Sequence, residues 1–211
     1  KVGNLTASLN NTGKVIDFAL NNATDTNSTV VVGPGEYNLT DSTPQDDQPE
    51  GQIEVSTASA SSISVFATNT TSPNRTEINT TAGLNNLIKI NDSDLDSLKI
   101  GNTSDEDPTN AGGIFFSTSG ADAINVTDTA DSFSLTFEDN NVSVSSGDGV
   151  VFDGDSTAPT VTVNSNTITG VTSFVNITGV TDNATVSGSI VGSSATGLNF
   201  SDSTSNLTGD A

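Results

Sequence analysis

Short groups of alternating apolar residues recur along the middle of this chain, separated by polar segments rich in Asn, Ser, Thr and Gly. Within most groups one apolar residue, one polar residue and a second apolar residue follow each other, as in a β-strand with one buried face. This pattern predicts an all-β fold built from many short strands. The groups are Ile53/Val55, Ile63/Val65, Ile88/Ile90, Leu98/Ile100, Ile114/Phe116, Ile124/Val126, Phe133/Leu135/Phe137, Val142/Val144 and Val150/Phe152.

Two elements near the N-terminus differ from these groups. Apolar residues at positions 15, 16, 19, 20 and 23 have the spacing of one helical face, so residues 15–23 are predicted to form a short amphipathic helix. A β-branched strand follows at residues 28–32, and Gly33-Pro34-Gly35 ends it with a turn. The sequence therefore predicts a helix, a strand and a tight turn ahead of the short strands.

This order resembles the start of right-handed parallel β-helix proteins of the pectate-lyase-like superfamily. The resemblance covers residues 14–40 by motif and implies that the helix caps the open end of the first coil. Two or three short strands would then make one coil of roughly 20 to 30 residues. Asn, Ser and Thr side chains would stack between successive coils. The alternative fold is an antiparallel β-sandwich throughout, because strands at such regular spacing fit it equally well.

The C-terminal part carries a second resemblance. Residues 155–163, 175–179 and 181–186 resemble the entry of the Ig-like modules repeated in prokaryotic surface adhesins, but fewer residues remain than such a sandwich needs. The predicted division is a tail or donor strand at 1–13, a parallel β-helix at 14–155 and a C-terminal β segment at 156–211. The last segment either continues the solenoid or forms an incomplete Ig-like sheet, whose open edge another chain can fill.

Charge is strongly one-sided in this chain. The 211 residues include 26 acidic and 5 basic ones, for a net charge of −21. Such a surface repels nucleic acid and anionic membranes, because binding to either depends on Lys and Arg. No apolar stretch approaches the roughly 20 residues that cross a bilayer, so no membrane insertion is expected. The acidic, Asp-rich composition is typical of a solvated, self-repelling surface and resembles that of proteins from salt-loving archaea.

Sequons for N-glycosylation are unusually dense. Of the 24 asparagines, 16 stand in Asn-x-Ser/Thr with x not Pro, where the Ser and Thr content would give about 7 by chance. A transferred glycan is bulky and hydrated, so a modified Asn faces solvent in a protein that has crossed a membrane. The density predicts an extracellular or cell-surface glycoprotein, although a chain this rich in Asn, Ser and Thr also makes some sequons incidentally. The candidate sites are Asn4, Asn10, Asn22, Asn27, Asn38, Asn69, Asn74, Asn79, Asn91, Asn102, Asn125, Asn141, Asn176, Asn183, Asn199 and Asn206.

The chain lacks the residues on which most catalytic and metal sites depend. Cys and His are absent, which removes thiolate chemistry, the commonest general base and a dedicated zinc site. Arg75 lies in a turn beside the sequon at Asn74, where a glycan would crowd a substrate groove, and Lys89 and Lys99 lie within predicted strands. We therefore predict no catalytic residue, no cofactor-binding residue and no dedicated metal ligand.

Calcium is the one cation that Asp-rich turns could hold, at residues 92–96, 105–107 and 148–155. The first turn has the alternating oxygens that begin a calcium loop. However, Ser97 and Thr103 stand where an EF-hand has Gly and Glu. Ordinary solvated turns are the alternative interpretation of all three segments.

These observations favour a non-enzymatic extracellular structural glycoprotein, a protomer of a filament, sheath or surface layer that binds copies of itself through β-strand edges. The first alternative is an adhesin or viral spike module that binds a host surface or a glycan. The chain has no Trp and a single Tyr for stacking on sugars, which argues against that alternative. The third interpretation is a polysaccharide-cleaving β-helix enzyme. Because the chain begins at Lys1 rather than Met, we also expect either a removed leader or an excised portion.

Overall fold

Short strands wind around one apolar core in the computed structural model of this chain. It describes residues 16, 19–33, 35–39, 53–56, 58–67, 76–80, 86–92, 94–101, 114–118, 122–129, 132–153, 159–178 and 184–201. The strands are β1 (Asn27–Val32), β2 (Gly35–Leu39), β3 (Ile53–Val55), β4 (Ser62–Ala67), β5 (Thr76–Thr80), β6 (Ile88–Asp92), β7 (Ser97–Gly101), β8 (Phe115–Thr118), β9 (Ile124–Thr129), β10 (Ser134–Glu138), β11 (Asn141–Val144), β12 (Val150–Asp153), β13 (Thr160–Thr178) and β14 (Thr185–Ser201).

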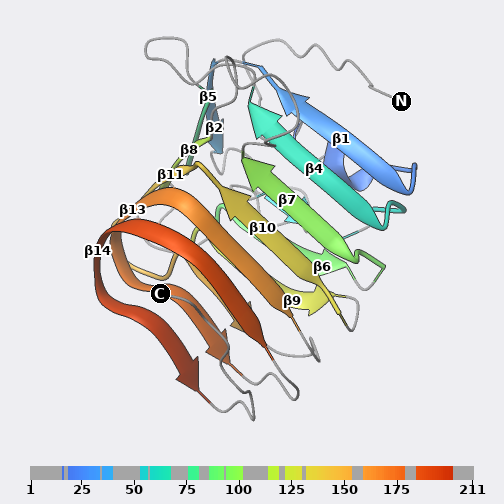
Figure 1. The fold of residues 1–211 in the computed structure, drawn as a ribbon. Helices are drawn as coiled ribbons and strands as arrows, with labels where there is room; N and C mark the ends of the chain where they lie inside the picture. The colour runs from blue at the N-terminus through green and yellow to red at the C-terminus, as the bar shows by residue number, and fades with distance from the viewer. Residues whose placement is uncertain are drawn as a thin grey trace, which may run out of the picture.

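The strands stack into three parallel sheets, which are the three sides of a solenoid (Figure 1). The first sheet contains β1, β4, β7 and β10, the second β2, β5, β8 and β11, and the third β3, β6, β9 and β12. The long strands β13 and β14 run through all three sheets and complete them. In Figure 1 the chain crosses the near sheet towards the left and returns behind it one coil lower, so the winding is right-handed.

This architecture confirms the predicted parallel β-helix. The alternative of an antiparallel sandwich is wrong, because the described strands pair in parallel register from β1 to β14. Each predicted apolar group lies in a strand or at its start. The pattern missed β5, where Ile78 is the only apolar residue.

Coil length differs from the predicted one in the first part of the solenoid. Val30, Val65, Ile100 and Phe137 are register partners separated by 35, 35 and 37 residues. Phe137, Val163 and Gly188 follow at steps of 26 and 25 residues, within the predicted range. The additional residues of the early coils lie between strands, largely in segments outside the described residues, and no apolar periodicity in the sequence sets their number.

Inward-facing residues form apolar columns that run the length of the solenoid. In the third sheet one column contains Ile53, Ile88, Ile124, Val150 and Val175, all of which are at most 5% exposed. Phe116 and Phe137 extend the core between the other two sheets, with ring centroids 5.7 Å apart. Burial of these columns is the main source of stability, because each coil covers the apolar face of the next.

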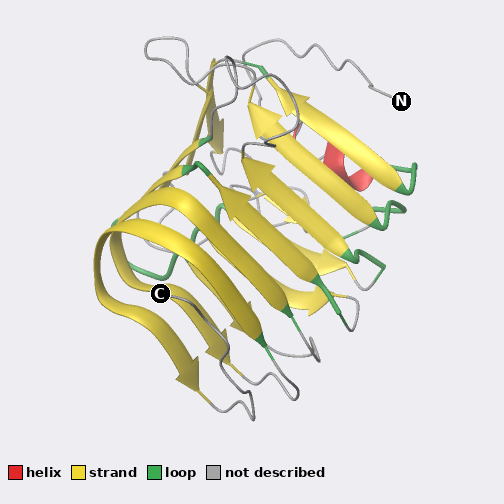
Figure 2. Ribbon diagram, in the orientation of Figure 1, coloured by secondary structure: helices red, strands yellow, loops and turns green. Residues whose placement is uncertain are grey.

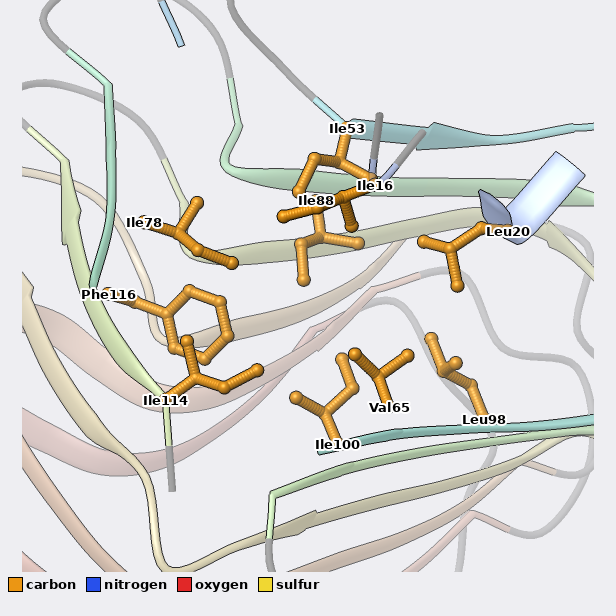
Figure 3. A pocket seen from close by; sticks show the side chains of 10 residues that line it. All are labelled: Ile16, Leu20, Ile53, Val65, Ile78, Ile88, Leu98, Ile100, Ile114 and Phe116. Carbon is orange, nitrogen blue, oxygen red and sulfur yellow. The ribbon is translucent and has the colours of Figure 1, made fainter. Parts of the chain in front are cut away.

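A short helical segment closes the N-terminal end, as predicted (Figure 2). Residues 16 and 19–21 are helical, and the side chains of Ile16 and Leu20 are 4% and 2% exposed. They point into the first coil toward Ile53, beside an apolar cavity of about 10 Å³ (Figure 3). This volume is marginal for one water molecule and has no polar lining group, so it is a packing gap beneath the cap rather than a ligand site.

Asn21 holds this cap on the edge of β3. Its Nδ2 donates to the Glu54 carbonyl at 2.6 Å, and its Oδ1 accepts from the Ser56 amide at 2.9 Å. One side chain therefore satisfies backbone groups that an added strand would otherwise use.

The C-terminal strands extend the solenoid in parallel register rather than pairing as a separate sandwich. β13 bends through all three sheets without a break in its strand assignment, and Gly170 lies at one corner with a φ of 77°. A Cβ atom at this position would lie 1.9 Å from the Val144 carbonyl oxygen of the preceding coil. Gly is required here because the backbone is left-handed and a neighbouring coil passes at contact distance.

Candidate functional site

The sixteen candidate glycosylation sites fall into distinct environments. Asn22, Asn27, Asn141 and Asn199 are exposed, whereas Asn79, Asn91, Asn125 and Asn176 are partly buried. Asn38 lies in β2. The other seven, Asn4, Asn10, Asn69, Asn74, Asn102, Asn183 and Asn206, lie outside the described residues. The described sequon asparagines therefore differ in how far their side chains are exposed to solvent.

Three sequon asparagines occupy one column on the outer face of the third sheet. Asn125 and Asn176 are both in register with Val151 of β12, and Asn176 is in register with Asn199 of β14. Asn199 Nδ2 donates to Asn176 Oδ1 at 3.1 Å, which forms a rung between the last two coils. The predicted stacking of Asn side chains between coils is confirmed here, and we call Asn125, Asn176 and Asn199 the asparagine column.

Two aspartates lie beside the asparagine column and tie successive coils together. Asp122 Oδ1 accepts a hydrogen bond from the Asp148 amide at 2.8 Å. One coil further, Asp148 Oδ1 accepts from the Ser173 amide at 2.7 Å, and Asp148 Oδ2 accepts from Asn176 Nδ2 at 2.7 Å. Each carboxylate thus satisfies a backbone donor of the next coil, and Asp148 also fixes an amide of the column. Charge-assisted bonds of this kind are stronger than bonds between neutral groups.

Asp122 has the most clearly perturbed carboxyl group of this region. Burial raises the pKa of Asp122 above its ordinary value of 3.8, and the negative charge of Asp148 raises it further. Hydrogen bonds from the Asp148 amide and the Asn125 side chain act in the opposite direction and lower the pKa. Burial dominates, so ionised Asp122 is held in the fold at a cost in free energy.

The Asp-rich turns serve the backbone in the part of the chain that is described. Asp92, which is 6% exposed, accepts from the Ala58 amide at 2.7 Å and from the Asp94 amide at 3.1 Å. No group of three carboxylates among the described residues lies close enough to hold a metal ion. The segment 105–107 and residues 154–155 lie outside the described residues. Calcium binding at these turns stays a prediction.

Two of the cations considered for chemistry pair with acids of neighbouring coils. Lys89 Nζ lies 3.5 Å from Glu54 Oε1, and Lys99 Nζ lies 3.3 Å from Glu138 Oε2. Both lysine side chains are 30% exposed and lie on the outer face of the solenoid. Lys1, Lys14 and Arg75 lie outside the described residues. The described lysines therefore act as links between coils.

The C-terminal edge of the solenoid is a long, uncharged strand. β14 is 17 residues long, pairs only with β13 among the described strands, and contains no charged residue and no Pro. β13 is also uncharged over its 19 residues. An edge strand in a soluble protein is usually protected by charge, Pro or brevity. None of these protections is present in β14.

Sequence reasoning missed Asp148 and Asn140 as structural residues. Asn140 is 2% exposed, donates to the Ile100 carbonyl at 3.0 Å and accepts from the Ile114 amide at 2.9 Å. Asp122 and Asp148 each lie two residues before a strand of the third sheet. This repeated position in the sequence could have identified Asp148 as a structural residue. Asn140 gave no comparable signal, because its partners lie 26 and 40 residues away.

Comparison of the chain with protein-family models, curated proteins and solved structures finds no match in any of the three. Within the described residues, no helix has the length and apolarity needed to cross a membrane. Function is therefore inferred from the two features above, the asparagine column and the uncharged β14 edge.

Proposed function

We propose that this chain is a non-enzymatic structural glycoprotein of the cell exterior, a protomer of a filament, sheath or surface layer that assembles through β-strand edges. The observation that carries the proposal is the β14 edge, a 17-residue strand without charge or Pro at the end of a chain with a net charge of −21. A copy of the same chain is the expected partner at this edge.

Charge explains why assembly concentrates at this end. Two copies that meet through their acidic faces repel each other, whereas contact at β14 brings together two uncharged strands. At the opposite end Ile16 and Leu20 cover the first coil, and Asn21 occupies backbone groups of β3. The β3 edge at this end is therefore less open to another strand than β14, although β1 is an uncharged edge strand as well.

The hydrogen bonds and ion pairs of the described polar side chains also fit a structural role. The carboxylates of Asp92 and Asp148 accept backbone amides, and Lys89 and Lys99 pair with acids between coils. These contacts occupy carboxylates and ammonium groups of the kind from which a hydrolase or lyase site is built. They support a scaffold rather than a catalyst.

The proposal is tested by measuring assembly against protein and salt concentration, with sedimentation velocity and electron microscopy. We expect species larger than one chain, favoured by about 1 M salt, because salt at that level screens charge repulsion beyond roughly 3 Å. A chain that remains monomeric at every concentration and salt level would contradict the proposal.

A matched pair of variants locates the contact. Thr136, Thr162 and Ser187 are register partners on the outer face of the first sheet, and only Ser187 belongs to β14. Ser187→Asp should weaken assembly at least about tenfold, because like charges across paired strands repel. Thr136→Asp adds the same charge two coils inside and should leave assembly unchanged. Equal effects of the two variants would exclude the β14 edge as the contact.

A further inference from the structure

The exposed and the hydrogen-bonded sequons offer very different targets for glycan transfer. In that reaction Asn Nδ2 forms a bond to C1 of the sugar, and the C1–O bond to a lipid-linked phosphate donor breaks. The phosphate leaves with the bonding electrons, and one Nδ2 proton passes to solvent. The acceptor amide must therefore be reachable, and the finished glycan must have room beside it.

Asn176 has neither freedom nor room in the folded chain. Its Nδ2 donates to Asp148 Oδ2 at 2.7 Å, and its Oδ1 accepts from Asn199 at 3.1 Å. Asp148 is itself fixed by the Ser173 amide at 2.7 Å. Neighbouring strands in a sheet lie only about 4.8 Å apart, so a sugar ring on Asn176 would displace the side chains above and below it.

Asn125 is constrained in a similar way two strands earlier in the column, on the other side of Val151. Its side chain hydrogen-bonds to the Asp122 carboxylate, and its Oδ1 is fully enclosed by protein. Asp122 also accepts from the Asp148 amide at 2.8 Å, so the group that orients Asn125 is held by the backbone of the next coil. A glycan here would require this contact network to open.

Asn27 and Asn141 have the opposite environment. Each is the first residue of its strand, β1 and β11 respectively, and each side chain is exposed. Asn27 pairs with Ser62 of β4, and Asn141 pairs with Phe115 of β8 and Thr167 of β13. The exposed side chain at either position leaves more room for a glycan than the hydrogen-bonded amide of Asn176.

We infer that glycans are carried by Asn27 and Asn141 and are absent from Asn125 and Asn176, whose side chains are bonded to the coil-joining carboxylates of Asp122 and Asp148. The inference rests on the proposed function, since it needs a chain that meets a glycosylation machinery. It divides one sequence motif into two physical roles, modification at exposed strand starts and hydrogen bonding to carboxylates beside the third sheet.

The test is site-resolved mass spectrometry of the full chain purified from its native source. We expect sugar on more than half of the peptides that contain Asn27 and Asn141, and on fewer than about a tenth of those that contain Asn125 and Asn176. Occupancy of Asn176 or Asn125 equal to that of Asn141 would overturn the inference and leave the proposed function standing. Sugar at no site would overturn both the inference and the glycoprotein part of the function.

Two variants that remove a sequon without changing its asparagine provide a matched control. Ser143→Ala removes the sequon of Asn141, and we expect the intact mass to fall by one glycan. Thr178→Ala removes the sequon of Asn176, and we expect no loss of glycan mass. The Thr178 hydroxyl lies 3.5 Å from Asn176 Oδ1, at the limit of a hydrogen bond, so this substitution leaves the Asp148 contact in place. Loss of a glycan in Thr178→Ala would contradict the inference.

Discussion

The early and late coils of this solenoid bury the same kind of core but connect it in different ways. The early coils take 35 to 37 residues and are linked on the outside by ion pairs such as Lys89–Glu54. The late coils take 26 and 25 residues, run through the corners as continuous strands and are joined by neutral contacts such as Thr162 to Ser187 at 3.3 Å. The extra residues of the early coils are not required by the core. The late coils show that 25 residues are enough for one turn of this solenoid.

The largest expected effect comes from a glycine that the late coils share in kind with Gly101 of the early coils, where the φ is 116° and an added Cβ would lie 1.7 Å from the Glu138 carbonyl oxygen. Gly170→Ala should reduce the free energy of unfolding by at least about 2 kcal/mol, because a left-handed φ of 77° is combined with a Cβ position 1.9 Å from a carbonyl oxygen. Chemical denaturation measures the change, and hydrogen exchange shows whether the late coils open first.

Gly33→Ala in the first coil is the matched control for this substitution. The nearest atom to its added Cβ is the Tyr37 hydroxyl oxygen at 3.9 Å, an ordinary contact. We expect a change below about 1 kcal/mol. Equal destabilisation by the two variants would show that the left-handed φ and the close carbonyl oxygen at Gly170 do not cause the effect.

A smaller effect is expected where a carboxylate joins the last early strand to the first late one. Asp148→Ala leaves the amide of Ser173, which is 3% exposed, without its acceptor and removes the partner of Asn176. We expect a loss of about 1–3 kcal/mol of unfolding free energy, the usual cost of an unsatisfied buried donor. Asp153→Ala removes an exposed carboxylate at the end of β12 and should change stability little. Stability that is the same in both variants would show that the Asp148 bonds do not hold the halves together.

The smallest effect concerns pH and Asp122. Its pKa in the folded chain is raised above 3.8 by burial, so its ionisation reduces stability as the pH rises from 3.8 through the folded-state pKa. Asp122→Asn keeps an oxygen that can accept from the Asp148 amide and removes this cost. The variant should therefore melt slightly above the wild type at pH 7, and the difference should shrink as the pH falls below about 3.8.

Asp94→Asn separates burial from net charge in this experiment. Asp94 is exposed, and its substitution removes the same unit of charge from a chain of −21. If both variants raise the melting temperature equally, relief of general repulsion accounts for the effect and the buried environment of Asp122 does not.

The sequence predicted most strands well because most present two or three apolar residues to the core. Pairs such as Ile88 and Ile90 define both a strand and its buried face. β5 was not predicted because Ile78 is its single apolar residue, so its sequence shows no alternating apolar pattern. Coil length was wrong for the early coils because corner segments obey no period, so stacking can be inferred from the pattern but not its register.

The candidate site was less accessible from sequence. A sequon has the same letters whether its asparagine is exposed, as at Asn141, or bonded to an aspartate, as at Asn176. The distinction depends on which residues the coils bring together, and Asp148 lies 28 residues from Asn176. The lack of charge in β14 was visible in the sequence, but its meaning appeared only when the strand proved to be the edge of the solenoid.

The parallel stacking of β1 to β14 has a mechanical consequence. Hydrogen bonds between neighbouring coils lie along the solenoid axis, so a pull along that axis loads the seams between coils in series, and the weakest seam limits the force. A pull on the C-terminus peels β14 from β13 one bond at a time. A pull along the strands instead shears many bonds together. The solenoid is therefore stiff across its width and yields coil by coil along its length.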